Sequence, residues 1–168
     1  EGREDIYISV NISPKDFYFM DVYKAFTELV AKHRISSASL KLEITETAMM
    51  SELERQRKLI GRLREAGFAV EMDDFGSGYS SLNMLKDIQV DTLKIDMAFL
   101  GKTDNEDRAS KILKMIVELS KQLEIPVITE GVETLDQVKF LREIGCDMFQ
   151  GYYFAKPMEV SAFEEKYM

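Results

Sequence analysis

Short apolar runs alternate with longer amphipathic runs along the whole chain. Short runs rich in β-branched and aromatic residues predict strands, whereas apolar residues recurring every three or four positions predict helices. Their alternation is typical of a β/α protein with a parallel sheet, and no linker or low-complexity segment divides it. The candidate strands are residues 6–12, 39–45, 68–74, 92–96, 126–131 and 147–154.

Four helices are predicted between these strands from their ends and their periodicity. Ser13 as N-cap, followed by Pro14, predicts a helix that continues through the run YKAFTELVAKH. Ser51 and Glu54 form a capping box ahead of a second helix, which Gly67 would end. The other two predicted helices are residues 106–124 and 135–145.

The two faces of the inner strands differ in polarity. A period of two places Leu42 and Ile44 on one face and Glu43 on the other, and the strands at 68–74 and 92–96 alternate in the same way. Strands of an open doubly wound sheet lie under helices on both faces and are almost continuously apolar. The alternation therefore favours a barrel with helices outside and a polar interior.

A polar residue stands at or near the carboxyl end of each candidate strand. In a (β/α) barrel these ends share one rim, where the active site is built. Singly, each residue has an ordinary explanation: Asn11 could cap a helix, Glu43 could pair with a surface lysine, and Lys94 could expose only its ammonium. Together they predict one shared site, made of Asn11, Glu43, Asp73, Lys94, Glu130 and Gln150.

Two adjacent aspartates, Asp73 and Asp74, end the third strand. Neighbouring carboxylates repel each other and raise each other's pKa unless a cation or hydrogen-bond donors hold them. A solvated acidic turn is the ordinary interpretation of such a pair. Its position on the predicted rim makes a cation site the alternative, with Gly76 and Gly78 letting the chain turn away.

Composition limits the chemistry further. The 168 residues carry 22 Lys plus Arg against 30 Asp plus Glu, a formal charge of -8, which argues against binding a nucleic-acid polymer. A small anionic ligand remains compatible if metal ions supply positive charge. With one histidine and one cysteine, Cys146, the chain has few nitrogen or sulfur ligands, so a metal site would use oxygen ligands of magnesium, manganese or calcium.

The same features predict where the protein works. A single cysteine allows no intrachain disulfide, which suits a reducing cytoplasm. No apolar run approaches the roughly 18 residues of a membrane span, and the first residues carry mixed charges. We therefore expect a cytoplasmic segment without membrane contact, although the parent protein could be tethered to a membrane.

Six segments follow one another along the chain: SVNIS (9–13), LEITET (42–47), DDFGSGYSSL (73–82), VDTLKID (90–96), ITEGVET (128–134) and QGYYFAKP (150–157). In this order and spacing they resemble the EAL domain family of bacterial cyclic di-GMP phosphodiesterases. The Glu-Ala-Leu triplet that names the family is absent and would precede the SVNIS strand. A complete barrel of this class needs about 250 residues. The resemblance thus implies an incomplete (β/α)8 TIM-like barrel with about six βα units, residues 1–168 being the C-terminal two-thirds of a single domain.

The resemblance also implies hydrolysis of one phosphodiester of cyclic di-GMP to linear pGpG with two Mg²⁺ or Mn²⁺ ions. Such ions neutralise the anionic ester and activate water. By resemblance, Asn11, Glu43 and Asp73 would hold one ion with the missing Glu, and Asp73 and Asp74 would hold the second. Lys94 would orient water and Glu130 would be the general base. The remaining roles would be substrate or water positioning by Gln150 and Asp96, and anchoring of the loop after Asp74 by Glu46.

The family further implies a homodimer, with the loop after Asp74 near the contact, and an upstream sensory or cyclase-type domain. One alternative function is a receptor that binds cyclic di-GMP, or a weakly active or inactive fragment, because the name-motif Glu is missing. A protein kinase is a second alternative, since Asp74-Phe75-Gly76 reads D-F-G. The chain lacks the catalytic loop and the Gly-rich loop that should precede that motif, so we reject it.

Overall fold

Strands and helices alternate along the folded chain. The computed structural model describes residues 6–50, 52–76, 81–97 and 106–168. In chain order the described elements are β1 (Ile8–Ile12), α1 (Asp16–Phe19), α2 (Val22–His33), the 3-10 helix η1 (Ser37–Ser39), β2 (Leu40–Thr45), α3 (Glu46–Met50), α4 (Leu53–Glu65), β3 (Ala69–Asp73), α5 (Ser81–Asp87), β4 (Thr92–Asp96), α6 (Glu106–Gln122), β5 (Val127–Glu130), α7 (Leu135–Glu143), β6 (Met148–Phe149) and α8 (Val160–Tyr167).

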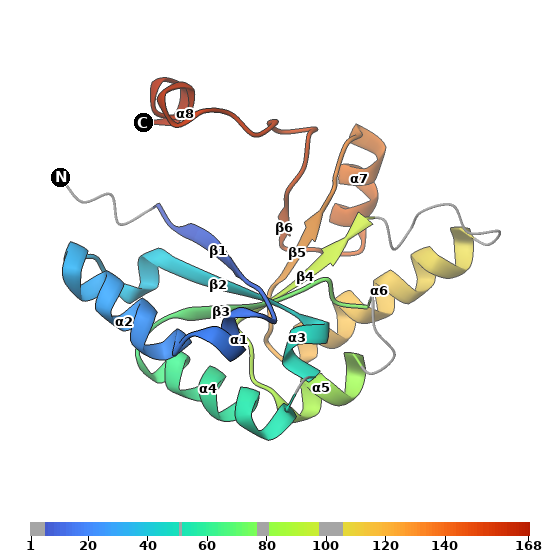
Figure 1. Cartoon of the computed structure of the whole chain (residues 1–168). Helices are drawn as coiled ribbons and strands as arrows, with labels where there is room; N and C mark the ends of the chain where they lie inside the picture. Colours follow the sequence, from blue (N-terminus) through green and yellow to red (C-terminus); the bar gives the residue numbers. More distant parts are fainter. Residues whose placement is uncertain (1–5, 51, 77–80, 98–105) are drawn as a thin grey trace.

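The strands form one parallel sheet in sequence order. Within the described residues it has six strands in the order β1-β2-β3-β4-β5-β6, so β1 and β6 are its edges. The helices α2, α4, α5 and α6 lie along one side of the sheet, and β1 and β6 diverge on the other side (Figure 1). The predicted parallel β/α arrangement of six units is confirmed.

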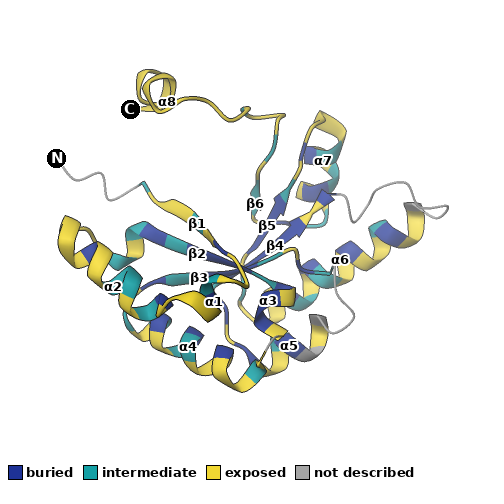
Figure 2. Ribbon diagram, in the orientation of Figure 1, coloured by how far each residue is buried: buried dark blue, intermediate teal, exposed yellow. Residues whose placement is uncertain are grey.

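The two faces of the sheet separate apolar from polar residues, as the alternation predicts. The face under the helices buries apolar side chains completely, and Figure 2 shows the inner strands in dark blue and teal, as buried and intermediate residues. They pack against buried leucines and isoleucines of α4 and α6, where close packing supplies most of the hydrophobic stabilisation. The fully buried strand residues include Leu42, Ile44, Val70, Met72, Leu93 and Ile95, each at 0% exposure.

The segment after β1 differs from its prediction. Instead of one helix beginning at Ser13, the chain forms the single turn α1 and then α2, with an extended Met20 between them. Ser13 caps nothing: its N–H and hydroxyl both donate to Asp16 Oδ2, each over 2.8 Å. Asp21 begins the second helix by accepting from the Lys24 N–H, and this competing cap explains the break.

The start of α4 also differs. Ser51, one half of the predicted capping box, lies outside the described residues. The N-cap is Glu52, in a left-handed conformation and without a side-chain cap bond, and Glu54 instead pairs with Arg57 at 3.3 Å. A capping box does form at α7, between Thr134 and Gln137, where none was predicted.

The last predicted strand is far shorter than residues 147–154. β6 comprises Met148 and Phe149 alone, because the chain then folds around Val132: the Val132 N–H donates to Gln150 O and the Tyr153 N–H donates to Val132 O, both over 3.0 Å. The remaining residues, 150–168, form a C-terminal arm. Its helix α8 has no buried residue.

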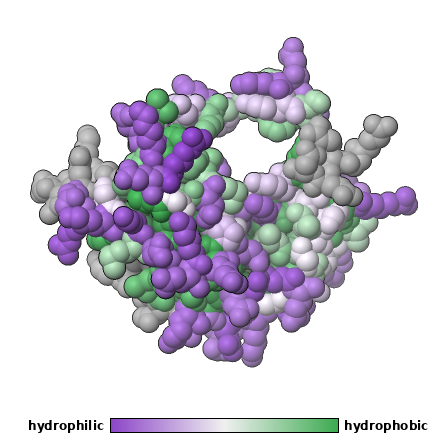
Figure 3. All heavy atoms as spheres, turned by 180° about the vertical axis from the view of Figure 1, so that it is seen from behind, coloured by the Kyte–Doolittle hydropathy of each residue, from purple (hydrophilic) through white to green (hydrophobic). Residues whose placement is uncertain are grey.

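The arm and β1 enclose a cavity of about 780 Å³, lined by residues that include Tyr7, Ile8, Gln150, Phe163 and Tyr167. From behind, an opening separates the arm from the body of the molecule (Figure 3). Within the described ranges, no helix combines the length and the apolar character needed to cross a bilayer.

Candidate active site

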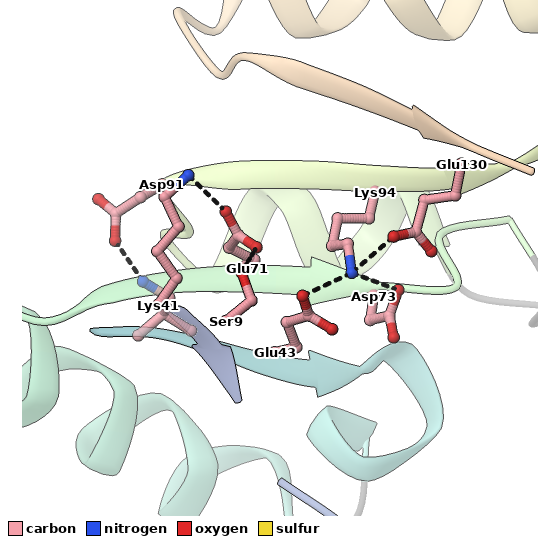
Figure 4. A network of polar contacts seen from close by, with 9 residues as sticks. Ser9, Lys41, Glu43, Glu71, Asp73, Asp91, Lys94 and Glu130 are labelled. Atoms are coloured by element: carbon pink, nitrogen blue, oxygen red, sulfur yellow. Dashed lines mark hydrogen bonds and ion pairs between the residues drawn. The ribbon is translucent and has the colours of Figure 1, made fainter. Parts of the chain in front are cut away.

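Four strands bring their polar side chains together at Lys94 (Figure 4). Lys94 lies on β4, and its Nζ is 2.7 Å from Glu43 Oε1 on β2 and 2.8 Å from Glu130 Oε1 on β5. Asp73 Oδ1 at the end of β3 is 3.7 Å away. The Lys94 side chain is only 3% exposed, so a buried cation lies among three carboxylates from neighbouring strands.

Burial and charge act in opposite directions on Lys94. Burial by itself would lower the pKa of its ammonium, but hydrogen bonds with Glu130 and Glu43 and the charge of Asp73 raise that pKa above the ordinary value. The three carboxylates therefore favour the charged form of Lys94. It can stabilise negative charge but cannot serve as a base.

Glu130 has the opposite character. Burial raises the pKa of its carboxyl, the hydrogen bond and charge of Lys94 lower it, and the charges of Asp73 and Glu43 raise it, with a net increase. A carboxylate with a raised pKa is a stronger base than an exposed one, and general bases work best when their pKa approaches the working pH. Glu130 therefore has the chemistry of a proton acceptor.

The Asp73-Asp74 pair ends β3 with a sharp change of direction. Asp74 has a positive φ of 54°, which turns its side chain away from the strand alternation. Its N–H donates to Asp73 Oδ1 over 3.0 Å, which fixes the inner carboxylate. Burial first, and then the charges of Asp73 and Asp96, raise the pKa of Asp74.

Glu46 contacts this turn through a hydrogen bond. Its side chain is fully buried at the start of α3, and its Oε2 accepts the Gly76 N–H over 3.1 Å. Ser77, Gly78 and Tyr79, which continue the predicted loop and the predicted dimer contact, lie outside the described residues.

The remaining predicted residues lie at strand ends around the Lys94 cluster. Asn11 is exposed on β1, opposite Glu43 in the register. Asp96 is exposed at the end of β4, opposite Glu130. Gln150 is exposed after β6 and is held by its backbone, whose N–H donates to Thr129 O over 2.8 Å.

A second buried ion pair, absent from the predicted site, lies one layer deeper in the sheet. Glu71 is the register partner of Glu43, and its side chain is 1% exposed. The Lys41 Nζ is 3.1 Å from Glu71 Oε1, and the Ser9 hydroxyl donates to Glu71 Oε2 over 3.4 Å. The period-two alternation already indicates these positions, because Lys41 and Glu71 each stand two residues before a predicted ligand.

The donor types suit a hard divalent cation. Carboxylate oxygens from Glu43, Asp73 and Glu130 already converge on a positive charge, and such oxygens are the preferred ligands of magnesium, manganese and calcium. Over the described ranges, no three acidic, histidine or cysteine side chains are already arranged as ligands of one ion. Lys94 provides the central cation in this structure.

Comparison with known proteins places this geometry in a family. The chain is 34% identical over 164 residues to the cyclic di-GMP phosphodiesterase NbdA of Pseudomonas aeruginosa, covering 98% of this chain and 21% of the relative. A solved structure of the PaMucR phosphodiesterase with c-di-GMP matches with a TM-score of 0.87 at 31% identity, over 95% of this chain and 71% of that one. Klebsiella pneumoniae BlrP1, solved with manganese and cy-diGMP, matches with a TM-score of 0.79 at 31% identity, over 90% and 39% of the two chains.

The chain spans only about a fifth of the length of the curated relatives that it matches first, with shares of 20% and 21%. It covers a much larger part of the PaMucR phosphodiesterase structure, which shows the predicted EAL-type fold, and the described part of the chain contributes six parallel strands to it. A family model described as "EAL domain" matches residues 1–157. The chain belongs to the EAL domain family.

Proposed function

We propose that this chain is the C-terminal two-thirds of a phosphodiesterase domain that hydrolyses one ester bond of cyclic di-GMP to give linear pGpG. The main support for this proposal is that Glu43, Asp73 and Glu130 converge on the buried Lys94 in a chain of the EAL family. Relatives named as cyclic di-GMP phosphodiesterases and structures solved with that ligand support the substrate.

The metal requirement is part of the proposal. Two Mg²⁺ or Mn²⁺ ions would be held by Asn11, Glu43, Asp73 and Asp74, and when bound they would neutralise the phosphate and activate water. The acidic donor set supports this, as does the manganese in the related BlrP1 structure. On a chain of charge -8, bound metal ions would add positive charge where the dianionic dinucleotide binds.

The other residues of the proposed site would accept a proton or position the substrate and water. Lys94 would face the phosphate oxygens with a fixed positive charge and orient the attacking water. Glu130 would accept the proton of that water, since its pKa is raised and its carboxylate is held at 2.8 Å by Lys94. Asp96 and Gln150 would position substrate or water at the rim, and Glu46 would anchor the turn at Gly76.

A receptor that binds cyclic di-GMP without cleaving it is the second candidate. The printed sequence contains no Glu-Ala-Leu triplet, so one proposed metal ligand is missing. We expect this chain to show weak or no turnover. A homodimer, and an upstream sensory or cyclase-type domain in a cytoplasmic or membrane-tethered parent protein, complete the proposal.

Two measurements on the same protein separate these functions. Calorimetry with cyclic di-GMP in Mn²⁺ or Mg²⁺ measures binding, and chromatography of the same mixture measures pGpG. Product with either metal identifies an enzyme, whereas metal-dependent binding without product identifies a receptor or a crippled enzyme. Neither binding nor product, with the chain folded by circular dichroism, contradicts both.

A further inference from the structure

A groove separate from the Lys94 cluster lies between α1, the start of α2 and α4, elements that are neighbours in Figure 1. Its volume is about 710 Å³. Its floor is apolar, because Phe17 and Val22 are 5% and 2% exposed and Leu59 is half-buried. We refer to it as the α1–α4 groove.

Large apolar side chains stand at the edge of this groove. Tyr18 and Met20 line it at 62% and 42% exposure, and Phe19 between them is 85% exposed. They lie outside the core, in which Phe17 is the buried residue of α1. Contiguous exposed apolar residues of this size are typical of interaction sites.

The α4 side of the groove is positively charged. Lys58 and Arg62 are exposed one helical turn apart, and among the described residues neither pairs with a carboxylate. Arg62 lies over the Tyr23 ring, with its guanidinium carbon 4.0 Å from the ring centroid. Two cations are thus available to an anionic partner.

The other charged groups that line the groove are already engaged. Arg55 pairs with Glu52 at 2.9 Å and donates to Phe17 O over 3.3 Å, which ties α4 to α1. Asp21 accepts the Lys24 N–H at the start of α2. Glu54 pairs with Arg57. The lining therefore carries three cations (Arg55, Lys58 and Arg62) against two carboxylates (Asp21 and Glu54), a local excess of positive charge on a chain of charge -8.

We propose that the α1–α4 groove docks an acidic amphipathic segment of a partner protein. Apolar side chains of that segment would lie on Phe17 and Leu59, and its carboxylates would pair with Lys58 and Arg62, as in other helix-in-groove complexes. The groove is concave, and a concave surface fits a single helix better than it fits a flat bilayer. This site goes beyond the proposed phosphodiesterase activity and does not depend on it.

The position of the groove would place a docked segment near the candidate active site. α1 follows the carboxyl end of β1, and α4 follows α3 after the carboxyl end of β2. A segment in the groove would therefore lie beside the end of the sheet that carries Glu43 and Asp73. In parallel β/α barrels this end holds the site, so a partner here is placed to control access to it.

The test uses a defined probe, a fluorescein-labelled amphipathic peptide of about 14 residues with leucines on one face and glutamates beside them. A second probe replaces every glutamate with lysine. Fluorescence anisotropy with the whole chain should show binding of the acidic probe alone. K58E/R62E should weaken it by about tenfold or more and should bind the lysine probe instead.

A matched variant controls for net charge. K114E/K121E makes the same charge change at exposed positions of α6 and should leave binding of the acidic probe unchanged. Phe19→Ser, which changes no charge, should weaken binding. All variants are compared after circular dichroism shows native helix content.

Four results would overturn the proposal. They are no binding of the acidic probe, equal binding by K58E/R62E, sedimentation of the chain with phosphatidylserine vesicles that K58E/R62E abolishes, and self-association in sedimentation equilibrium that K58E/R62E abolishes. The last two would assign the groove to a lipid surface or to a second copy of the chain.

Discussion

Lys94 shows how one residue organises the site. Its ammonium offsets part of the charge of three carboxylates that come from three different strands and that would otherwise repel one another more strongly. Buried charges are tolerated only when they are paired in this way. The same arrangement supplies a fixed cation and, in Glu130, a carboxylate whose raised pKa suits proton transfer.

Replacing Lys41 should destabilise the protein, because the buried Glu71 would lose the cation with which it pairs. In Lys41→Met the Glu71 carboxylate, 1% exposed, loses its cation, and the free energy of unfolding should fall by about 3–5 kcal/mol. Urea unfolding measures this loss. The double variant K41M/E71Q removes both charges and should recover most of the stability; equal losses in the single and double variants would contradict a charge-pair role.

Cys146 should give stability a distinct pH dependence. Burial raises the pKa of its thiol, while hydrogen bonds with Thr129 and the backbone oppose this effect. The unfolded thiol therefore ionises first, so the free energy of unfolding falls as pH rises through the ordinary thiol pKa of about 8.5. Denaturant unfolding between about pH 7 and pH 10 should show this slope in the wild type and lose it in Cys146→Ala. Parallel curves for the two proteins would refute the assignment.

Residue-level prediction succeeded where a strand's alternation decided which way a side chain points. Glu43, Asp73, Lys94 and Glu130 come together as that alternation indicates. The alternation did not reveal which side chain pairs with which carboxylate. Contacts between side chains of different strands depend on the register in which those strands pair. Lys41 and Glu71 were missed for that reason, although their positions satisfy the same rule.

At the scale of elements, the alternation of short and long apolar runs predicted the parallel strands. Local hydrogen bonds that the pattern does not indicate decided where individual helices and strands end. Asp21 divides the first predicted helix, because its side chain accepts the Lys24 N–H and so begins a new helix. β6 ends early, because the chain after Phe149 binds the backbone of Val132 instead of a neighbouring strand. α8 was not predicted: it packs no residue into the core, so it lacks the buried stripe on which helix prediction rests.

A substitution at Gly151 should loosen the C-terminal arm. A Cβ there would clash with the Val132 carbonyl oxygen, a backbone atom that cannot move aside without shifting the chain. Gly151→Ala should destabilise the protein by at least about 1–3 kcal/mol and increase proteolysis of residues 150–168. Gly61→Ala is the matched control, since nothing lies within 4 Å of its Cβ and alanine favours a helix by about 1 kcal/mol. Unchanged stability and proteolysis in Gly151→Ala would contradict the close approach.

For the whole molecule, the open sheet is the dominant feature. β1 and β6 are its edges within the described residues, and between β1 and the C-terminal arm lies the cavity of about 780 Å³. Open edges are a recognised route to association, which fits the proposal that this chain is part of a larger barrel. The sequence predicted six units by their repeating pattern, but the path of the arm depends on contacts at Val132 that no local pattern reports.

The central claim is that Asp73 and its neighbours form a metal-dependent phosphodiesterase site. The most direct test follows pGpG formation from cyclic di-GMP with Mn²⁺, in a protein that carries this chain together with a name-motif Glu-Ala-Leu strand, and in its Asp73→Asn variant. We predict product from the first protein and a loss of at least about a hundredfold in the variant, with native circular dichroism in both. Absence of product from the first protein, or equal rates in the two, would contradict the account.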